Sequence, residues 1–160
     1  MSKEKFPTTP AVLVLKTQHA DFTLHHYPYE ERGGTKTAAA KLMVDEHRII
    51  KTLIMEDESA RPLIILMHGD KEVSTKSLAR AIGVKAVSPC HPATAEKHTG
   101  YKVGGTSPFG TRKALPVYME QTIADLLEIY INAGARGILA RMPASEVIRI
   151  LKPVSVSVAI

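Results

Sequence analysis

Apolar residues in this chain form short continuous runs, typical of strands, and spaced patterns, typical of helices. Two such runs, at residues 63–67 and, interrupted by Lys51 and Thr52, at residues 49–55, flank a polar stretch at residues 56–62. A polar connection of this length between short apolar runs predicts a hairpin of antiparallel strands. Further strands are predicted at residues 21–29, 116–119, 128–132, 138–142 and 154–158.

Helix signals lie between these runs. Ser74 precedes a segment whose Leu78, Ala81 and Ile82 fall on one helical face, and Gly83 follows it. Serine before and glycine after such a pattern predict a capped helix. Other helices are predicted at residues 35–43 and 92–98, and from Pro143 through residue 151.

The first apolar segment is ambiguous. Thr9 and Pro10 read as an N-cap and a first helical residue before residues 11–16, yet the β-branched Val12 and Val14 suit a strand equally well. Strands and helices follow one another without a regular βαβ rhythm. This mixture predicts an α/β (α+β) fold with a mixed, barrel-like sheet flanked by helices, in a single domain over residues 1–160.

Composition narrows the setting. The chain has 160 residues, of which 44% are apolar and 23% are charged, so fibrous and disordered classes are excluded. One cysteine, Cys90, rules out an intramolecular disulfide and favours a reducing compartment. The longest wholly apolar run has five residues, against about 20 for a membrane-spanning helix. The N-terminus also lacks the apolar core of a secretory signal, so we expect a cytoplasmic protein without a membrane partner.

Positive charge is distributed unevenly. The formal net charge is +5, and residues 81–160 carry nine basic and only five acidic side chains. No carboxylate occurs at residues 97–119, which contain Lys97, Lys102, Arg112 and Lys113. An anionic partner is expected there first, although a solvated basic surface without a partner explains the charge equally well.

The most unusual segment is residues 100–113, with four glycines, one proline and three basic residues. Such a loop can bring backbone N–H groups close to a negatively charged atom. It is not a Walker A loop, because Thr111 and Arg112 stand where that motif needs Lys and Ser or Thr. The alternative is a long turn that tolerates positive φ angles.

Lys51 interrupts an apolar strand. It is either an exposed strand lysine or a fixed charge that holds a phosphate or a developing oxyanion. No histidine spacing predicts a metal site, and no Gly-x-Ser-x-Gly elbow occurs. We therefore expect no metal, no cofactor and no side-chain nucleophile.

Three segments together resemble a known family. They are Lys51-Thr-Leu53, the string Thr99-Gly-Tyr-Lys-Val-Gly-Gly-Thr-Ser-Pro-Phe-Gly110, and Ile129-Tyr-Ile-Asn-Ala-Gly-Ala-Arg-Gly137. Their order and spacing resemble the YbaK/EbsC family of aminoacyl-tRNA deacylases from about residue 10 to residue 151. The family includes free-standing Cys-tRNA(Pro) deacylases and editing domains associated with prolyl-tRNA synthetase.

The resemblance implies hydrolysis of a wrongly attached small amino acid, of Cys or Ala type, from the 3′ end of tRNA(Pro). It implies a reaction assisted by the substrate's own groups, with lyase character if a substrate thiol cyclises. The implied partners are aminoacyl-tRNA and, as a candidate, prolyl-tRNA synthetase, with neither DNA nor membrane. The oligomeric state stays open.

The resemblance also assigns residues. Lys51, Gly104 and Gly105 are the implied catalytic residues, with Lys51 binding the terminal adenosine and its phosphate. The implied substrate-binding residues are Tyr27, Thr106, Ser107, Pro108, Asn132 and Gly134. The implied tRNA-binding residues are Lys102, Arg112, Lys113 and Arg136.

Departures from the cysteinyl pattern leave the edited amino acid open. Asn132 replaces a serine, Leu139 replaces an aspartate near the pocket, and Thr106 replaces an apolar residue. A catalytically silent module that binds tRNA or a nucleotide in the same groove is the second hypothesis. It predicts salt-sensitive binding without ester cleavage.

Overall fold

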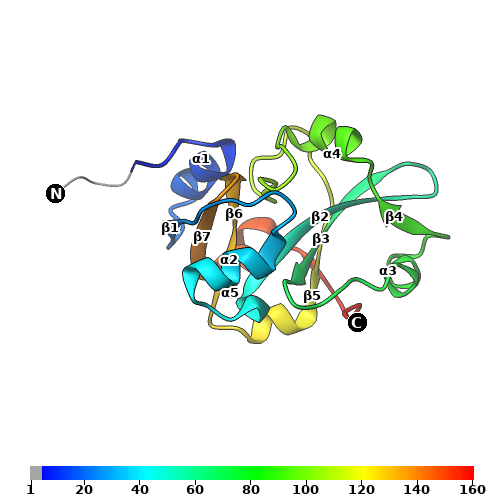
Figure 1. Cartoon of the computed structure of the whole chain (residues 1–160). Helices are drawn as coiled ribbons and strands as arrows, with labels where there is room; N and C mark the ends of the chain where they lie inside the picture. The colour runs from blue at the N-terminus through cyan, green and yellow to red at the C-terminus, as the bar shows by residue number, and fades with distance from the viewer. Residues whose placement is uncertain (1–4) are drawn as a thin grey trace.

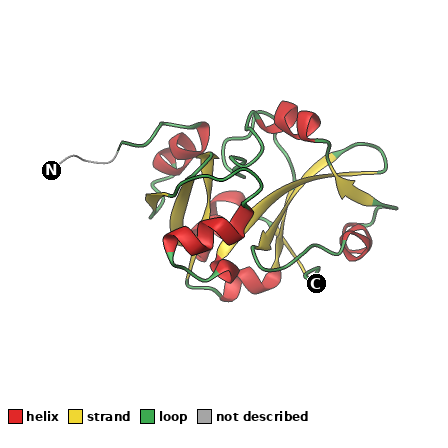
Figure 2. Cartoon of the chain, viewed as in Figure 1, coloured by secondary structure: helices red, strands yellow, loops and turns green. Residues whose placement is uncertain are grey.

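The computed structural model describes residues 5–160, and Figure 1 and Figure 2 show the arrangement of its elements. One mixed sheet runs in the order β1-β7-β6-β2-β3-β5-β8, and β4 pairs with β2 beside this path. Its strands are β1 (Thr23–His26), β2 (Ile49–Asp57), β3 (Pro62–His68), β4 (Val87–Pro89), β5 (Val117–Glu120), β6 (Glu128–Ala135), β7 (Ile138–Pro143) and β8 (Val154–Val156).

Helices cover the sheet. The α-helices in this part of the chain are α1 (Pro10–Thr17), α2 (Gly34–Leu42), α3 (Thr75–Ile82), α4 (Pro92–Thr99) and α5 (Ala144–Leu151). Short 3₁₀ helices, η1 (Glu46–Arg48) and η2 (Gln121–Asp125), precede β2 and β6. The expected α/β class is confirmed. The sheet is not closed, because no pairing joins β1 to β8 among residues 5–160.

The ambiguous first segment is helical, because its N-cap is satisfied. The Thr9 side chain accepts a hydrogen bond from the Val12 backbone N–H at 3.1 Å, and Pro10 opens α1. Ser74 caps α3 in the same way, and Gly83 ends that helix in the left-handed region with a φ of 77°. Pro143 is the N-cap of α5 rather than its first residue. Local capping chemistry therefore explains most helix boundaries.

The predicted hairpin of β2 and β3 is confirmed, and its turn is built around Asp57. Asp57 Oδ1 accepts the backbone N–H groups of Ser59 and Arg61 at 2.8 and 3.0 Å, and Oδ2 accepts Arg61 Nε at 2.8 Å. Hydrogen bonds from Arg61, chiefly from its backbone, hold the pKa of this carboxyl below its usual range. Asp57 is buried beneath an exposed turn, and these hydrogen bonds keep its carboxylate ionised.

The long strand β2 directs alternate side chains to different clusters of the core. Ile50 and Ile54 pack into the largest cluster with α1, α5 and the inner strands. Met55 packs on the cluster that contains α3, and Ile49 packs on the one that contains α2. Because side chains alternate along a strand, Lys51 belongs to the face of Ile49 and Met55, between α2 and α3.

The sequence missed several elements. The strand β4 and the two 3₁₀ helices were not predicted, and β1 is shorter than the predicted residues 21–29. β4 pairs only with the end of β2, at Met55–Asp57. Three residues held by one neighbour leave little periodic pattern to recognise. No helix within residues 5–160 is both long and apolar enough to cross a membrane.

Phe109 anchors the glycine-rich segment in the core, where it is 1% exposed. We expect Phe109→Ala to lower the free energy of unfolding by about 3–5 kcal/mol, because it leaves a cavity in a packed core. Urea denaturation measures this loss. Val103→Ala, at a 53%-exposed position of the same loop, should change stability by no more than about 0.5 kcal/mol. Equal losses for both variants would contradict the anchoring role.

Candidate functional site

One edge of β2 is unpaired over part of its length, and the main cavity lies beside β2. β2 pairs with β6 only at Ile49 and Ile50, and with β4 only from Met55 onward. Between these points β2 pairs with β3 on one side and with no strand on the other. The hydrogen bond from Cys90 N–H to Ile54 O, at 3.0 Å, is made on this unpaired side. An edge of this kind exposes backbone polar groups. It gives the site a wall that can hydrogen-bond a ligand.

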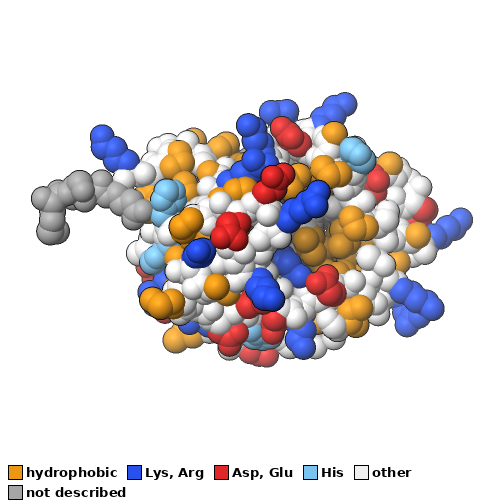
Figure 3. Space-filling model, viewed as in Figure 1, with side chains coloured by type: hydrophobic (Ala, Val, Ile, Leu, Met, Phe, Trp, Pro, Cys, Tyr) orange, Lys and Arg blue, Asp and Glu red, His pale blue; other side chains and the backbone are white. Residues whose placement is uncertain are grey.

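The cavity has a volume of about 630 Å³, in the range of small-molecule sites. Figure 3 shows a hollow on this face with hydrophobic side chains at its base and charged side chains around it. Its walls come from the segment before and within α2, from β2, from the start of α4, from the glycine-rich loop and from β6 and β7. The lining includes Tyr27, Tyr29, Thr35, Lys51, Thr52, Ile54, Cys90, Ala95, Gly104, Thr106, Asn132, Arg136 and Leu139.

Lys51 supplies a positive charge to the lining of this cavity. Its side chain is only 18% exposed. The ammonium Nζ donates a hydrogen bond to the backbone carbonyl of Lys71 at 2.5 Å and lies 3.5 Å from Glu72 Oε1. Thr52, the next residue, has a buried hydroxyl with no hydrogen-bond partner within the described chain. The interpretation of Lys51 as an ordinary exposed strand lysine is therefore wrong.

Two aromatic residues hold the glycine-rich loop in place. Tyr101 and Phe109 are both buried, and Tyr101 Oη donates to Phe109 O at 2.5 Å. Burial raises the pKa of Tyr101 to about 12, so this hydroxyl stays a donor at neutral pH. Ser107 is fully buried and accepts the Phe109 backbone N–H at 3.2 Å. Buried side chains and hydrogen bonds therefore fix the conformation of this loop, in which Gly100, Gly104 and Gly110 have the positive φ angles of the predicted turn.

Positions 104 and 105 require glycine, because neighbouring atoms lie too close for a side chain. Gly104 has a φ of 86°, and a Cβ atom there would lie 2.5 Å from Tyr29 Oη. A Cβ on Gly105 would lie 2.9 Å from the Arg136 backbone nitrogen. Two backbones meet here, so any side chain at Gly105 would push the loop away from the turn between β6 and β7.

Asn132 and Arg136 fasten this loop to the sheet. Asn132 Nδ2 donates to Gly104 O and Ala135 O, both at 3.2 Å. Arg136 Nε donates to Val103 O at 2.8 Å, and its guanidinium lies 5.2 Å from the ring centroid of Tyr29. The register of β6 against β7 shifts between Asn132 and Ala135, which turns these side chains toward the loop.

The structure brings some of the predicted site residues together and separates others. Six of them line the cavity: Tyr27, Lys51, Gly104, Thr106, Asn132 and Arg136. Burial and, to a smaller extent, the neighbouring Tyr29 raise the pKa of the Tyr27 hydroxyl. The residues outside the lining are Lys102, Gly105, Ser107, Pro108, Arg112, Lys113 and Gly134.

The residues outside the cavity fall into two groups. Gly105, Ser107 and Pro108 are buried residues of the loop itself, and Gly134 lies against Tyr101 and Thr9. The basic residues Lys102, Arg112 and Lys113 are exposed. They belong to the loop itself but do not line the cavity, so any contact they make with a ligand lies outside the cavity.

Sequence reasoning missed Tyr29 and the loop that holds Lys51. Tyr29 contacts Gly104 and Arg136, and only its position two residues after Tyr27 could have indicated it. In residues 69–74, between β3 and α3, the sequence showed only the helix cap Ser74 and no sign of a site. These residues supply the partners of Lys51, and a backbone carbonyl leaves no mark in a sequence.

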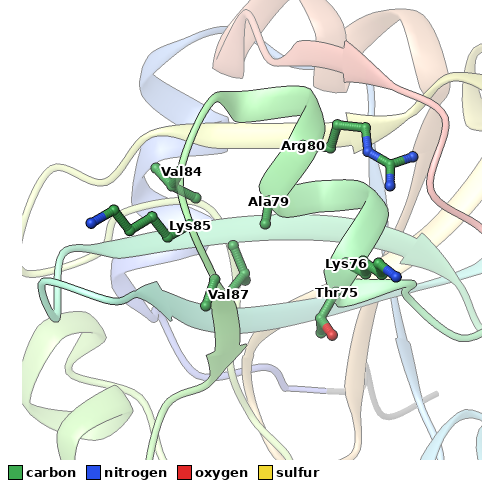
Figure 4. Close-up of a pocket in the computed structure, with 8 residues that line it drawn as sticks. Thr75, Lys76, Ala79, Arg80, Val84, Lys85 and Val87 are labelled. Atoms are coloured by element: carbon green, nitrogen blue, oxygen red, sulfur yellow. The ribbon is translucent and has the colours of Figure 1, made fainter.

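A second cleft, of about 530 Å³, lies between α3 and β4. Figure 4 shows Ala79, Val84 and Val87 beneath it, with Lys76 and Arg80 projecting from α3 away from Lys85. Its cations do not converge on one point, and it contains no glycine-rich loop. The cavity beside Lys51 is therefore the candidate functional site.

A histidine pair contacts the loop of residues 69–74 through Asp70. The His47 and His68 rings stack at 3.7 Å between centroids, and His47 Nδ1 lies 2.8 Å from Asp70 Oδ1. His68 is 1% exposed, and its ring nitrogens lie 2.8 Å from His47 O and 2.7 Å from Thr122 Oγ1. Burial is the main cause that lowers the pKa of His68, and the charge of His47 lowers it further. A hydrogen bond to the His47 backbone and the charges of Asp70 and Glu120 act in the opposite direction.

Comparisons with known proteins show the family of the chain. Residues 30–150 match the family described as "Aminoacyl-tRNA editing domain". The chain is 32% identical over 121 residues to the "Putative Cys-tRNA(Pro)/Cys-tRNA(Cys) deacylase EbsC" of Enterococcus faecalis, covering 71% of this chain and 74% of the relative. It is 23% identical over 104 residues to a proline–tRNA ligase of Limosilactobacillus fermentum, covering 62% of this chain and 18% of the ligase.

A solved structure shares the fold. The crystal structure described as "a putative trans-editing enzyme for prolyl tRNA synthetase" superimposes with a TM-score of 0.84 at 21% identity, covering 97% of this chain and 98% of that one. At this identity the likeness shows the fold alone.

Gly105→Ala should displace the glycine-rich loop, because the added Cβ meets backbone atoms that cannot rotate away. We expect a loss of about 1–3 kcal/mol in the free energy of unfolding, measured by urea denaturation. Thr106→Ala, one residue further along, is the matched control and should cost no more than about 0.5 kcal/mol. A Gly105→Ala variant as stable as the control would refute the close contact.

The pH dependence of stability should report His68. The unfolded chain binds a proton at this histidine near pH 6.5, whereas the folded chain does so only at lower pH. Between these two values the unfolded state holds more protons, so the contribution is complete above about pH 6.5 and is lost as the pH falls below it. Urea denaturation between pH 7.5 and 5 should show a shallower fall for His68→Gln than for the wild type. Identical slopes would contradict the assignment.

Proposed function

The chain belongs to the aminoacyl-tRNA editing domain family, and we propose that it acts in trans to hydrolyse a mischarged small amino acid, of Cys or Ala type, from tRNA(Pro). One observation carries the proposal. A partly buried ammonium, Lys51, and a glycine backbone, Gly104, line the same small cavity. This pairing suits a substrate with a phosphate close to an ester.

Lys51 is proposed to bind the phosphate of the terminal adenosine. A lysine ammonium is a compact charge, and low solvent exposure strengthens its attraction for an anion. The only carboxylate within ion-pair distance in the described chain, Glu72, has a side chain that is 81% exposed. An exposed carboxylate competes weakly, so the ammonium stays available to a substrate phosphate.

Gly104 is proposed to present its backbone to the ester carbonyl. The N–H of Gly105 is already donated to Lys102 O at 2.8 Å. Gly105 then acts by packing tightly against the turn of β6 and β7, while Gly104 lies at the cavity wall. A fixed backbone donor can stabilise the negative charge that develops on the carbonyl oxygen in the tetrahedral intermediate.

The nucleophile in this proposal belongs to the substrate or to water. With a cysteinyl ester, the thiol sulfur bonds to its own carbonyl carbon, the bond to the ribose oxygen breaks, and the thiol proton passes to that oxygen. With an alanyl ester, a water activated by a ribose hydroxyl adds to the carbonyl, and the amino acid and the free tRNA leave. Both routes need positioning more than a protein nucleophile.

The walls around the proposed ester are mainly apolar. Ile54, Ala95 and Leu139 line the cavity together with Cys90. Such a surface suits a methyl or thiol side chain, while a single methylene changes discrimination by only about 1–3 kcal/mol. Substitutions such as Leu139 can therefore change which amino acid is preferred.

The exposed basic residues near the loop are proposed to bind the tRNA backbone outside the cavity. Lys102, Arg112 and Lys113 are exposed within residues 100–113. Arg136, in the turn of β6 and β7, is exposed as well and also lines the cavity, so it is proposed to bind the tRNA at the cavity mouth. Phosphate contacts of this kind make binding dependent on salt. Prolyl-tRNA synthetase, whose Limosilactobacillus form contains a related segment, is the proposed partner.

Lys51→Ala should abolish most deacylation. Removing a fixed charge beside the reacting ester is expected to lower kcat/KM by about 100-fold or more. Release of the amino acid is measured with Cys-tRNA(Pro), Ala-tRNA(Pro) and a panel of other mischarged tRNAs. Lys76→Ala on α3, outside this cavity, is the matched control and should keep wild-type rates.

Two results would contradict the proposed function. One is a wild-type protein that releases no amino acid from any tRNA in the panel while it still binds tRNA in a salt-dependent way, as expected of a silent binding module. The other is a Lys51→Ala variant that deacylates as fast as the Lys76→Ala control.

A further inference from the structure

Lys51 is held by a loop with no regular structure of its own. Its ammonium donates to the carbonyl of Lys71 at 2.5 Å, in the connection between β3 and α3. The carboxylate of Glu72 is exposed and therefore contributes little as an ion pair. The position of the Lys71 carbonyl thus decides where the ammonium sits, and what fixes this loop also fixes Lys51.

The last residues of the chain pair with this loop. The Glu72 N–H donates to Ile160 O at 3.0 Å, and the Ile160 N–H donates to Glu72 O at 2.9 Å. Val73 forms an isolated antiparallel bridge with Ala159, and the Ser74 N–H donates to Val158 O at 2.8 Å. Residues 158–160 and 72–74 therefore form a short two-stranded ladder outside the main sheet.

A buried carboxylate anchors the ladder. Glu120, at the end of β5, is 2% exposed, and its Oε1 accepts the backbone N–H groups of Val158 and Ala159 at 2.6 and 3.0 Å. Val158 is itself 2% exposed within the core. The tail is thus fixed up to Ala159 by contacts that do not involve Lys51.

Ile160 differs from its neighbours in this respect. Its side chain is 72% exposed, so it adds little to the core. Its two backbone hydrogen bonds go to Glu72, the residue after the carbonyl that holds Lys51. The loop is also held at Asp70 by its contact with His47. His47 and Ile160 therefore hold the residues on either side of Lys71.

We infer that Ile160 is a positioning residue for Lys51, acting through its backbone hydrogen bonds to Glu72. With these bonds formed, the Lys71 carbonyl is held against the ammonium and aims it into the cavity. Without them, residues 71–73 move, and the ammonium loses its fixed partner. This inference rests on the proposed role of Lys51, and its physical part can be tested separately.

Ile160→Pro removes the N–H that donates to Glu72 while leaving Glu120, Val158 and Ala159 in place. The reactivity of Lys51 is read by brief acetylation with acetic anhydride and mass spectrometry of the labelled peptides. We expect Lys51 to be labelled about fivefold faster in Ile160→Pro than in the wild type, because a charged donor has lost its fixed acceptor. Lys41, on α2, is the internal reference and should not change.

Ile160→Ala keeps both backbone hydrogen bonds and is the matched variant, so its labelling pattern should equal that of the wild type. A chain that ends at Ala159 should behave as Ile160→Pro does. Ile160→Pro and the chain that ends at Ala159 should both unfold within a few degrees of the wild-type temperature, since an exposed residue contributes little stability.

Deacylation supplies the second readout. Loss of positioning should raise KM about fivefold and leave kcat within twofold, because the phosphate is bound less well before any chemistry occurs. Partial unfolding would instead lower the apparent kcat and leave KM unchanged. Such a result, or faster labelling in Ile160→Ala, would overturn the inference.

The labelling experiment needs no activity. If the wild type proves inactive on every tRNA, the proposed function fails, while the labelling of Lys51 in Ile160→Pro still decides whether Ile160 positions it. Unchanged labelling in Ile160→Pro and in the chain ending at Ala159 would overturn the inference whatever the activity.

Discussion

The site depends on one constraint of sheet geometry, which is that a strand in the middle of a sheet must satisfy both of its edges. β2 meets this requirement on one side with β3 along its length, and on the other with β6 at its start and β4 at its end. Between these contacts the strands diverge, and the backbone faces a cavity instead of a neighbour. Lys51 and Thr52 lie in this interval, so the defect in pairing is also the place where a ligand can bind.

Local patterns predicted much of the fold. The hairpin of β2 and β3 follows from two apolar runs, and α3 follows from Ser74 and Gly83, because these signals act between residues close in sequence. β4 could not be predicted, since its three residues are strand only through pairing with Met55–Asp57. The opening of the sheet was equally hidden, because no local pattern states where two distant strands stop pairing.

The candidate site was predictable to the extent that it is made of unusual residues. A lysine in an apolar strand and four glycines in a short loop are visible in any sequence, and both reach the cavity region. Ser107 and Pro108 belong to the same motif but are buried and do not line the cavity. A motif includes the residues that keep a loop in shape as well as those that contact a ligand. The partners of Lys51 are a main-chain carbonyl and an exposed carboxylate, which leave no signature.

The composition of the site fits the chemistry of an aminoacyl ester. Such a bond is already activated, so an enzyme gains most by fixing the phosphate, the carbonyl and an internal nucleophile in one arrangement. That task needs rigid supports, and the structure supplies them by hydrogen bonds. Asn132 and Arg136 hold the glycine-rich loop, and residues 158–160 hydrogen-bond Glu72 and Ser74, next to the Lys71 carbonyl that accepts from Lys51. In the proposed mechanism Lys51 is the main side chain that acts on the substrate, and backbone groups hold it and present Gly104 to the ester.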